Sequence, residues 1–319
     1  MKAEVYSATR PRSTRYVILR KNLTAVKKDW QLYSLLILPV IYYVIFRYIP
    51  MFGNVIAFRK FYPGGPVYGT EWVGLRYFKM FWTDPTFWQV FKNTIILSVE
   101  YLVFSFPFPI VFALLLNELR NQLFKRFVQT VSYLPHFLSM VIVAGMIMEI
   151  LSPSTGVVNM VLKHFTGKTI NFLAEPQWFR TIYIVSGIWQ QMGWNAILYL
   201  AALANINPEL YEAAIIDGAN RWQQTLHVTI PGIMPTIMIL LILNIGGLMS
   251  VGFEKILLLY NPLTYSTADV ISTYLYRMGL ESNNFSYAAA IGLFESVIGL
   301  ILLSTANYIS RRFADMSLW

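Results

Sequence analysis

The chain has 319 residues, of which 56% are hydrophobic and only 13% are charged, and its net charge is +9. An ordinary soluble domain carries about 25% charged residues, so this composition excludes that class and indicates a polytopic membrane protein. The apolar runs are continuous rather than alternating with period two, which favours membrane helices over a barrel.

The chain contains no cysteine, and its three histidines, His136, His164 and His227, lie in different segments. Disulfides, thiolate metal sites and cysteine nucleophiles are therefore excluded, and we expect no metal site. We attribute the positive net charge to membrane orientation and lipid contact rather than to nucleic-acid binding.

Six apolar runs are each close to the ~20 residues that cross a bilayer as a helix. They cover about residues 32–51, 93–117, 127–151, 179–204, 232–254 and 288–310. We therefore predict an all-α fold, with a basic cytoplasmic N-terminal segment at 1–31 and a six-helix membrane domain at 32–319. Within the second run, Pro107 and Pro109 are expected to break or kink the helix.

Basic residues indicate the orientation of these spans. They are concentrated before the first span, in the short loop after the second and at the C-terminal end: Lys2, Arg10, Arg12, Arg15, Arg20, Lys21, Lys27, Lys28, Arg120, Lys125, Arg126, Arg311 and Arg312. An even number of spans places both termini on one side, which the positive-inside rule makes cytoplasmic. The outward loops are also net cationic, a charge that suits an acidic saccharide or an acidic binding protein.

In this topology residues 205–231 form a cytoplasmic loop with clear helix signals. Asn207 can cap a helix, Pro208 suits its first position, and Glu209 complements the helix dipole. Gly218 follows where a left-handed helix end requires glycine. We predict one short helix that ends near Asp217 and a second short helix over residues 219–229.

Polar residues at membrane depth are candidates for the substrate cavity, because they are costly there and usually face a bundle interior or a wet cavity. The candidates, from the fourth and fifth spans, are Gln190, Gln191, Trp194, Asn195, Asn244 and Ser250. Amides can donate to and accept from sugar hydroxyls, and aromatic faces stack on pyranose rings. The alternative is that these residues only bond and pack between helices.

Four glutamates, Glu100, Glu149, Glu254 and Glu295, lie in or near the spans. We expect them near the outer interface, paired with Lys92, Arg47 or Lys255, and a proton relay is the alternative. His136 is expected to be a packing histidine rather than a proton carrier.

No nucleotide-binding motif is present. Gly167-Lys168-Thr169 resembles the end of a phosphate-binding loop, but Leu162 stands where that motif requires glycine. ATP must therefore be bound by another chain, and we expect a transport subunit rather than an enzyme.

The string Glu212-Ala213-Ala214, with Asp217-Gly218 and Ile230-Pro231 after it, resembles the EAA loop of permease subunits from binding-protein-dependent ABC importers. Further motifs resemble one branch of the sugar permeases, which serves complex oligosaccharides and polysaccharide fragments of the pectin and alginate type. These motifs are Tyr48-Ile49-Pro50-Met51, Trp72-Val73-Gly74-Leu75, Lys92-Asn93-Thr94, Leu114-Leu115-Leu116-Asn117-Glu118, Tyr133-Leu134-Pro135-His136-Phe137 and Tyr199-Leu200-Ala201-Ala202-Leu203. The chain departs from this branch at Thr225-Leu226, where relatives often have bulky aromatics.

This resemblance implies a type I importer permease fold in a bacterial cytoplasmic membrane. It assigns Glu212, Ala213 and Ala214 to contact with an ATPase subunit, and Asp217 and Gly218 to the turn that follows. The implied partners are a second homologous permease, with a heterodimer expected, two ATPase subunits that bind ATP and Mg²⁺, an extracytoplasmic solute-binding protein and an oligosaccharide. Two other functions stay open: a proton-coupled secondary transporter that uses Glu100 or Glu295, and a membrane scaffold or receptor without transport.

Overall fold

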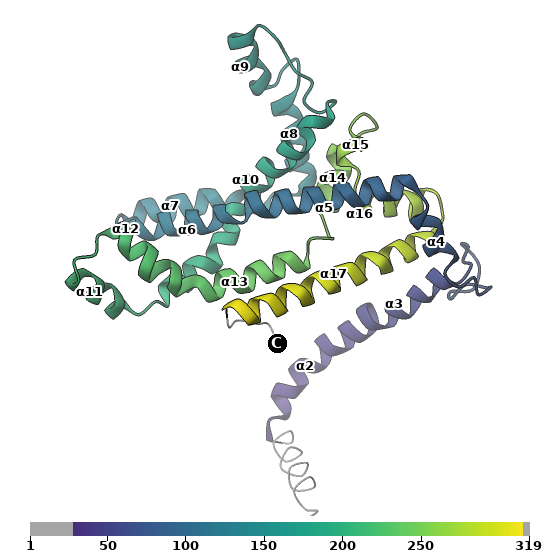
Figure 1. Cartoon of the computed structure of the whole chain (residues 1–319), viewed down its shortest axis with the longest axis horizontal. Coiled ribbons are helices and arrows are strands. Elements are labelled where there is room, and N and C mark those ends of the chain that lie inside the picture. Colours follow the sequence, from purple (N-terminus) through teal and green to yellow (C-terminus); the bar gives the residue numbers. More distant parts are fainter. Residues whose placement is uncertain (1–27, 315–319) are drawn as a thin grey trace, which may run out of the picture. The chain divides into compact units, whose positions relative to one another are not determined.

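The computed structural model describes residues 28–314, and every regular element in this range is a helix (Figure 1). The chain divides into two compact units, Met1–Val55 and Ile56–Trp319. Within the described residues, Arg59 and Trp72 also form an isolated antiparallel β-bridge.

The first unit contributes one apolar helical run. It consists of α2 (Trp30–Tyr43), the π-helical η1 (Val44–Tyr48), α3 (Ile49–Met51) and the 3-10 segment η2 (Phe52–Phe58), whose last residues belong to the second unit. The run Trp30–Phe58 is long and apolar enough to cross a membrane, which agrees with the predicted first span.

The second unit begins with the helices α4 (Arg76–Trp82), α5 (Pro85–Ser105), α6 (Pro107–Glu118), α7 (Gln122–Tyr133), η3 (Leu134–Phe137), α8 (Met140–Leu151), α9 (Val157–Thr166) and α10 (Pro176–Ala204). It continues with α11 (Pro208–Ile216), α12 (Arg221–Gln224), η4 (Thr225–Thr229), α13 (Ile230–Gly246), α14 (Phe253–Leu259), α15 (Tyr265–Ala268), α16 (Ile271–Tyr276), η5 (Arg277–Glu281) and α17 (Phe285–Ala314). In Figure 1, α5, α6, α13 and α17 run nearly parallel, whereas α8 and α9 project to one side.

Three further runs pass the length and hydropathy required of a membrane helix: Pro85–Glu118, Arg221–Gly246 and Phe285–Arg312. They correspond to the predicted second, fifth and sixth spans. As predicted, the second is interrupted at its prolines, because α5 ends at Ser105 and α6 begins at Pro107.

The predicted third span is not one straight helix. The segments Gln122–Phe137 and Met140–Leu151 meet at 101°, so they form a broken span or a re-entrant turn. Pro135 starts a tight 3-10 turn, Leu138 is extended, and Ser139 caps α8 by accepting from the backbone N–H of Ile142. The chain therefore starts a new helix here instead of continuing the old one.

The predicted fourth span is α10, which has 29 residues but is less apolar than the other four runs. It contacts α5, α6, α7, α13 and α15, so it is lined by protein over much of its length. At Gly193 an added Cβ would lie 2.2 Å from the backbone oxygen of Ser132, so the backbones of α10 and α7 are in direct contact. Small residues permit this approach between membrane helices.

The predictions for the fifth span and the segment before it are wrong in two respects. The region 219–229 is not a separate short helix, because α12, η4 and α13 form one run from Arg221 to Gly246. The π-helical turn of η4 ends at Thr229, two residues before Pro231, and changes the hydrogen-bonding pattern where proline would otherwise clash. The helix also ends at Gly246 rather than near residue 254, and turns follow.

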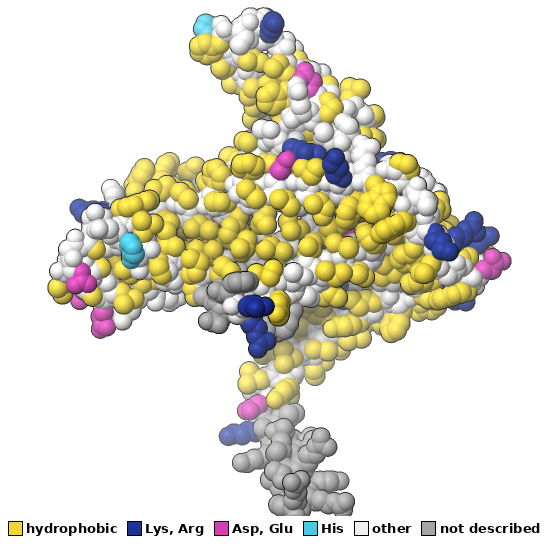
Figure 2. All heavy atoms as spheres, viewed as in Figure 1, with side chains coloured by type: hydrophobic (Ala, Val, Ile, Leu, Met, Phe, Trp, Pro, Cys, Tyr) yellow, Lys and Arg dark blue, Asp and Glu magenta, His cyan; other side chains and the backbone are white. Residues whose placement is uncertain are grey.

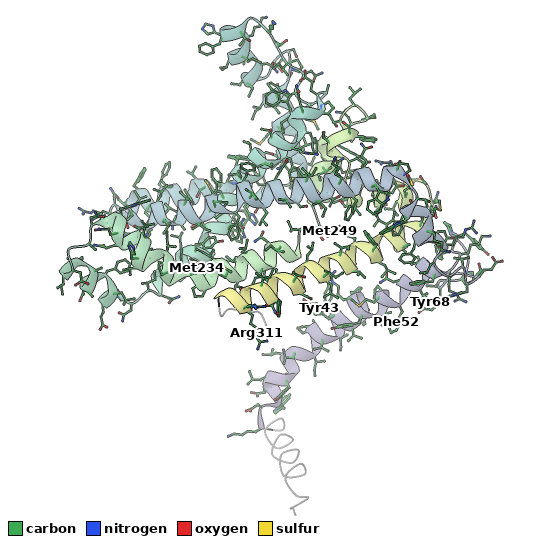
Figure 3. All side chains as sticks on the ribbon, viewed as in Figure 1. Tyr43, Phe52, Tyr68, Met234, Met249 and Arg311 are labelled. Carbon is green, nitrogen blue, oxygen red and sulfur yellow. The ribbon has the colours of Figure 1, made fainter. Side chains whose placement is uncertain are left out.

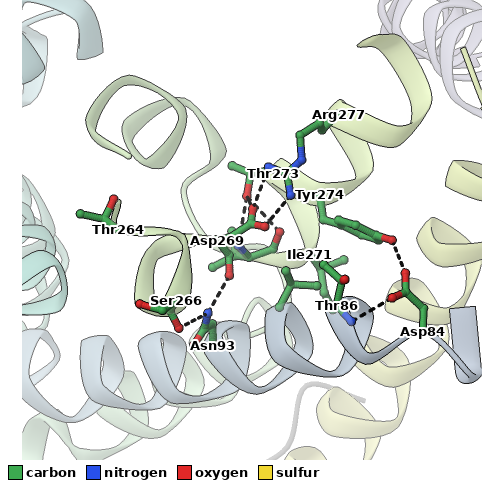
Figure 4. Close-up of polar contacts among 12 residues, drawn as sticks. Asp84, Thr86, Asn93, Thr264, Ser266, Asp269, Ile271, Thr273, Tyr274 and Arg277 are labelled. Atoms are coloured by element: carbon green, nitrogen blue, oxygen red, sulfur yellow. Dashed lines mark hydrogen bonds and ion pairs between the residues drawn. The ribbon is translucent and has the colours of Figure 1, made fainter. Parts of the chain in front are cut away.

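A polar network fastens the segment between α14 and α17 to the start of α5 (Figure 4). Asp84 caps α5 through the backbone N–H of Thr86 at 2.8 Å and accepts from the Tyr274 hydroxyl at 2.6 Å. Burial acts to raise the pKa of Asp84, but the hydrogen bonds from Tyr274 and Thr86 outweigh it and hold the pKa below its ordinary value. Asp269 pairs with Arg277 at 2.5 Å.

Candidate functional site

The cytoplasmic loop of the predicted topology contains α11, and its ends are built as the sequence indicates. The Asn207 side chain accepts from the backbone N–H of Glu209 at 3.1 Å, and Pro208 is the first helical residue. Gly218 has a positive φ of 80°, and the N–H of Ala219 bonds to the carbonyl of Ala214 at 2.9 Å. Both cap predictions are confirmed, so α11 is a short helix with fixed ends.

The surface of α11 is open, and no residue of the helix is buried. In Figure 2 acidic side chains gather at the end of the molecule where Figure 1 places α11, in contrast to the apolar surface of the bundle. A hollow of about 430 Å³ lies beside the helix and is lined by Leu210, Ala213, Ala214, Asp217, Gly218, Ala219, Gln223, His227 and Val228. Four of the five predicted coupling residues therefore line one concave surface, and Glu212 is exposed on the same helix.

Sequence reasoning missed the contacts that tie this loop to the bundle. The Tyr211 hydroxyl lies 3.0 Å from the Thr229 hydroxyl, which joins α11 to the end of η4, directly before α13. Arg221 bonds to Glu118 at 2.8 Å, which joins α12 to the end of α6. No local pattern could indicate these pairs, because the partners are 18 and 103 residues apart.

A cavity of about 280 Å³ lies where α13 ends, and two of the predicted substrate residues line it. The lining residues are Ser98, Tyr101, Leu102, Tyr183, Leu243, Asn244, Gly247, Leu248, Ser250, Val251 and Gly252. Asn244 donates its amide N–H to the carbonyl of Leu240 at 2.7 Å, which leaves its side-chain oxygen available to a ligand.

The irregular backbone after α13 forms one wall of this cavity. Ser98 donates a short hydrogen bond to the carbonyl of Leu248, and the N–H of Gly252 donates to the Tyr183 hydroxyl at 3.1 Å. Met249, labelled in Figure 3, follows the end of α13 and is 2% exposed. Non-helical backbone within a membrane protein is tolerated where protein or a water-filled cavity satisfies its polar groups, and here Ser98 and Tyr183 satisfy two of them.

The other four predicted substrate residues lie elsewhere on α10. Gln191 and Trp194 meet at His136, whose Nδ1 is 2.9 Å from the Gln191 side-chain oxygen and whose ring stacks on Trp194 at 4.3 Å. Gln190 is buried, and Asn195 is exposed. The six candidates therefore do not form one site. The packing prediction for His136 agrees with this stacked position.

Among the described residues none of the four glutamates forms an ion pair with Lys92 or Lys255, so these two predicted partners are wrong. Glu100 lies 3.6 Å from Arg180, and Glu149 accepts from the Thr155 hydroxyl at 3.0 Å. Lys255 instead donates to the backbone oxygen of Tyr183 at 2.9 Å. A hydropathy pattern places such groups at a depth in the membrane but does not say which helix lies opposite.

A bundle of apolar helices, a cavity at the end of α13 and a capped helix exposed at one end fit a subunit of a membrane transporter. The chain belongs to the family of binding-protein-dependent transport system inner membrane components, which it matches over residues 105–315. Within that family it is a sugar ABC permease of the polysaccharide branch, and the predicted resemblance is confirmed.

Two curated relatives from Bacillus subtilis (strain 168) match nearly the whole chain. Protein LplB is 44% identical over 297 residues, 93% of each chain. The polygalacturonan/rhamnogalacturonan transport system permease protein YteP is 44% identical over 301 residues, 94% of each chain.

Two solved structures have the same fold. One is a bacterial ABC transporter involved in the import of the acidic polysaccharide alginate, with 45% identity, a TM-score of 0.84 and coverage of 92% of this chain and 99% of that chain. The other is a bacterial alginate ABC transporter in complex with a periplasmic protein that holds an alginate pentasaccharide, with 44% identity, a TM-score of 0.85 and the same coverage.

Proposed function

We propose that this chain is one of two membrane subunits of an ATP-driven importer that carries oligosaccharides or polysaccharide fragments, acidic ones among them, into the cytoplasm. The observation that carries the proposal is α11, a helix capped at both ends and exposed on its surface, whose Tyr211 bonds to Thr229 directly before α13. Arg221 of the following helix α12 bonds to Glu118 at the end of α6. A rigid helix of this kind can transmit a rigid-body motion from one subunit to another.

In this proposal the chain crosses a bacterial inner membrane six times, with both termini cytoplasmic. The broken segment α7–α8 and the polar helix α10 supply the third and fourth crossings. α11 is the cytoplasmic EAA coupling helix: Ala213, Ala214, Asp217 and Gly218 form the concave surface, and Glu212 pairs with a basic side chain of the ATPase subunit.

The proposed assembly contains a second homologous permease, two ATPase subunits that bind ATP and Mg²⁺, and an extracytoplasmic binding protein that delivers the saccharide. Support for the binding protein comes from the related alginate transporter, which was solved with its periplasmic protein bound. Support for acidic substrates comes from that transporter and from YteP, whose names specify alginate and polygalacturonan/rhamnogalacturonan.

The first test is purification of the tagged chain from its native membrane, followed by ATP hydrolysis with and without binding protein and trigalacturonate. A second permease and an ATPase should be recovered with it, and hydrolysis should be stimulated. Glu212→Gln should abolish this stimulation without preventing insertion, whereas Glu209→Gln on the same helix should retain it. Uptake by the lone chain in liposomes without ATP would overturn the proposal in favour of a proton-coupled transporter.

A further inference from the structure

Lys255 is a buried cation close to the cavity at the end of α13. Lys255 is 4% exposed. Its ammonium group donates to the backbone oxygen of Tyr183 at 2.9 Å and lies 4.8 Å from the centre of the Tyr183 ring. Within residues 28–314 it takes part in none of the ion pairs. A buried cation that is hydrogen-bonded but has no carboxylate to balance its charge is costly, so its presence points to a function.

Tyr183 connects this cation to the cavity. Its side chain lines the cavity, its hydroxyl accepts from the N–H of Gly252 at 3.1 Å, and its ring meets Tyr101, another lining residue, edge to face at 5.6 Å. The positive charge of Lys255 therefore lies directly behind the aromatic wall of the cavity.

Arg180 is a second cation near this wall, although neither Arg180 nor Lys255 lines the cavity itself. It precedes Tyr183 by one helical turn on α10, and its residue is partly exposed. Its guanidinium lies 3.6 Å from Glu100 and donates to the Asn93 side chain at 3.3 Å, while its Nε is buried without a hydrogen-bond partner. This long contact with Glu100 leaves part of the guanidinium able to bind another carboxylate.

The charges around the cavity are consequently unbalanced. Arg180 contributes one positive charge, Lys255 contributes a second when it is protonated, Glu100 contributes one negative charge, and no carboxylate lines the cavity itself. We propose that Arg180 and Lys255 make this cavity selective for saccharides that carry carboxylates, that is, for uronate oligosaccharides over neutral ones. This inference rests on the proposed function and assigns substrate specificity to two residues of this chain.

The environment of Lys255 supports this assignment. Burial lowers the pKa of Lys255 to about 7, because the surrounding protein disfavours the charged form. A carboxylate brought to the cavity would favour that charged form and so gain a binding partner that a neutral sugar does not use.

The test uses the complete transporter in proteoliposomes with its binding protein and ATP, and the measured quantity is the concentration of trigalacturonate that gives half-maximal uptake. Lys255→Met and Arg180→Met should each raise this concentration about tenfold, which corresponds to the loss of about 1.4 kcal/mol of attraction between one cation and a substrate carboxylate. Lys255→Arg keeps the positive charge, so its half-maximal concentration should stay close to that of the wild type. Lys168→Met removes an equal charge from an exposed outer residue and should change nothing.

Glu100→Gln separates an electrostatic role from a structural one. It breaks the same ion pair as Arg180→Met but removes a negative charge, so the half-maximal concentration should fall. If Glu100→Gln and Arg180→Met impair uptake equally, or if Lys255→Met has no effect, the inference is wrong. A wild-type transporter that carries neutral trisaccharides but not trigalacturonate also overturns it. A wild-type complex that carries no saccharide overturns the proposed function instead.

Discussion

The hydrogen bond between Tyr211 and Thr229 gives the most direct test of how α11 is coupled to the membrane helices. Tyr211→Phe removes only the hydroxyl that lies 3.0 Å from Thr229. We expect the variant to fold and to keep its ATP hydrolysis, but to transport less saccharide for each ATP that is hydrolysed. The reason is that this bond joins α11, the proposed coupling helix, to the end of η4 directly before α13, whose other end borders the cavity.

The size of the effect follows from the surroundings of Thr229. Thr229 is buried, but its hydroxyl also lies 3.3 Å from the carbonyl of Gln224, so it keeps a partner when the tyrosine hydroxyl is removed. The loss is then that of one net hydrogen bond, about 1 kcal/mol, without an additional penalty for an unpaired buried group. A change of about 1 kcal/mol in the coupling free energy between α11 and α13 corresponds to about a fivefold change in the equilibrium constant by which movement of one shifts the other.

The assay is simultaneous measurement of uptake and ATP hydrolysis in proteoliposomes that contain the whole transporter. Tyr211→Phe should lower the ratio of uptake to hydrolysis about fivefold, from the estimate of about 1 kcal/mol. Thr229→Val should do the same, and the double variant should be no worse than either single variant, as expected for two residues that share one contact. Thr225→Val is the matched control, because that hydroxyl bonds within its own helical run, to the carbonyl of Arg221.

Two results would refute this reasoning. One is an unchanged ratio of uptake to hydrolysis in Tyr211→Phe. The other is an equal loss in Thr225→Val, which would show that any hydroxyl lost from η4 weakens the protein without a specific link to α11.

Three further outcomes are expected. Gly193→Ala should destabilise the chain by about 1–3 kcal/mol or more in thermal unfolding, because the new Cβ would lie 2.2 Å from a backbone oxygen. Gly247→Ala should be tolerated, because the new Cβ would have no neighbour closer than 3.6 Å. Equal stabilities of the two variants would contradict the packing argument. The hydrogen bonds from Tyr274 and Thr86 hold the pKa of Asp84 below its ordinary value in the folded protein, so its contribution to stability is present above that ordinary value and is lost as the pH falls through the folded-state pKa. Asp84→Asn should therefore be less stable at pH 7 and show a smaller loss on acidification, measured as unfolding midpoints between pH 3 and pH 7. Glu295→Gln should retain ATP-driven uptake that is insensitive to uncouplers, and loss of uptake in this variant would favour proton coupling.

The sequence predicted the features that depend on local signals. Four membrane runs follow from the length of their apolar stretches, and the interruption before Pro107 follows from proline chemistry. The ends of α11 follow from Asn207, Pro208 and Gly218, because each residue acts on backbone groups within a few positions of itself. Such local signals predict the same helix ends and breaks whatever tertiary contacts surround them.

Features that depend on distant contacts could not be predicted in this way. A hydropathy window over residues 127–151 does not register the right-angled break, which is made by one extended residue and a serine cap. Hydropathy places Glu100 within a predicted span, but its partner Arg180 is 80 residues away on another helix. Likewise, the cavity brings Ser98 and Tyr183 together with Asn244, whereas Gln191 and Trp194 on the same helix as Tyr183 lie at His136.

The backbone contact between α7 and α10 determines which helices are free to move. Because no side chain separates Gly193 from Ser132, rotation of α10 alone would drive another side chain into a backbone oxygen, so the two helices should move as one body. α13 has more freedom: Gly246 faces the flexible end of Leu303, and the segment after the helix contains Gly247 and Gly252. Changes in the width of the cavity should therefore arise from displacement of α13 against a stationary wall formed by α10.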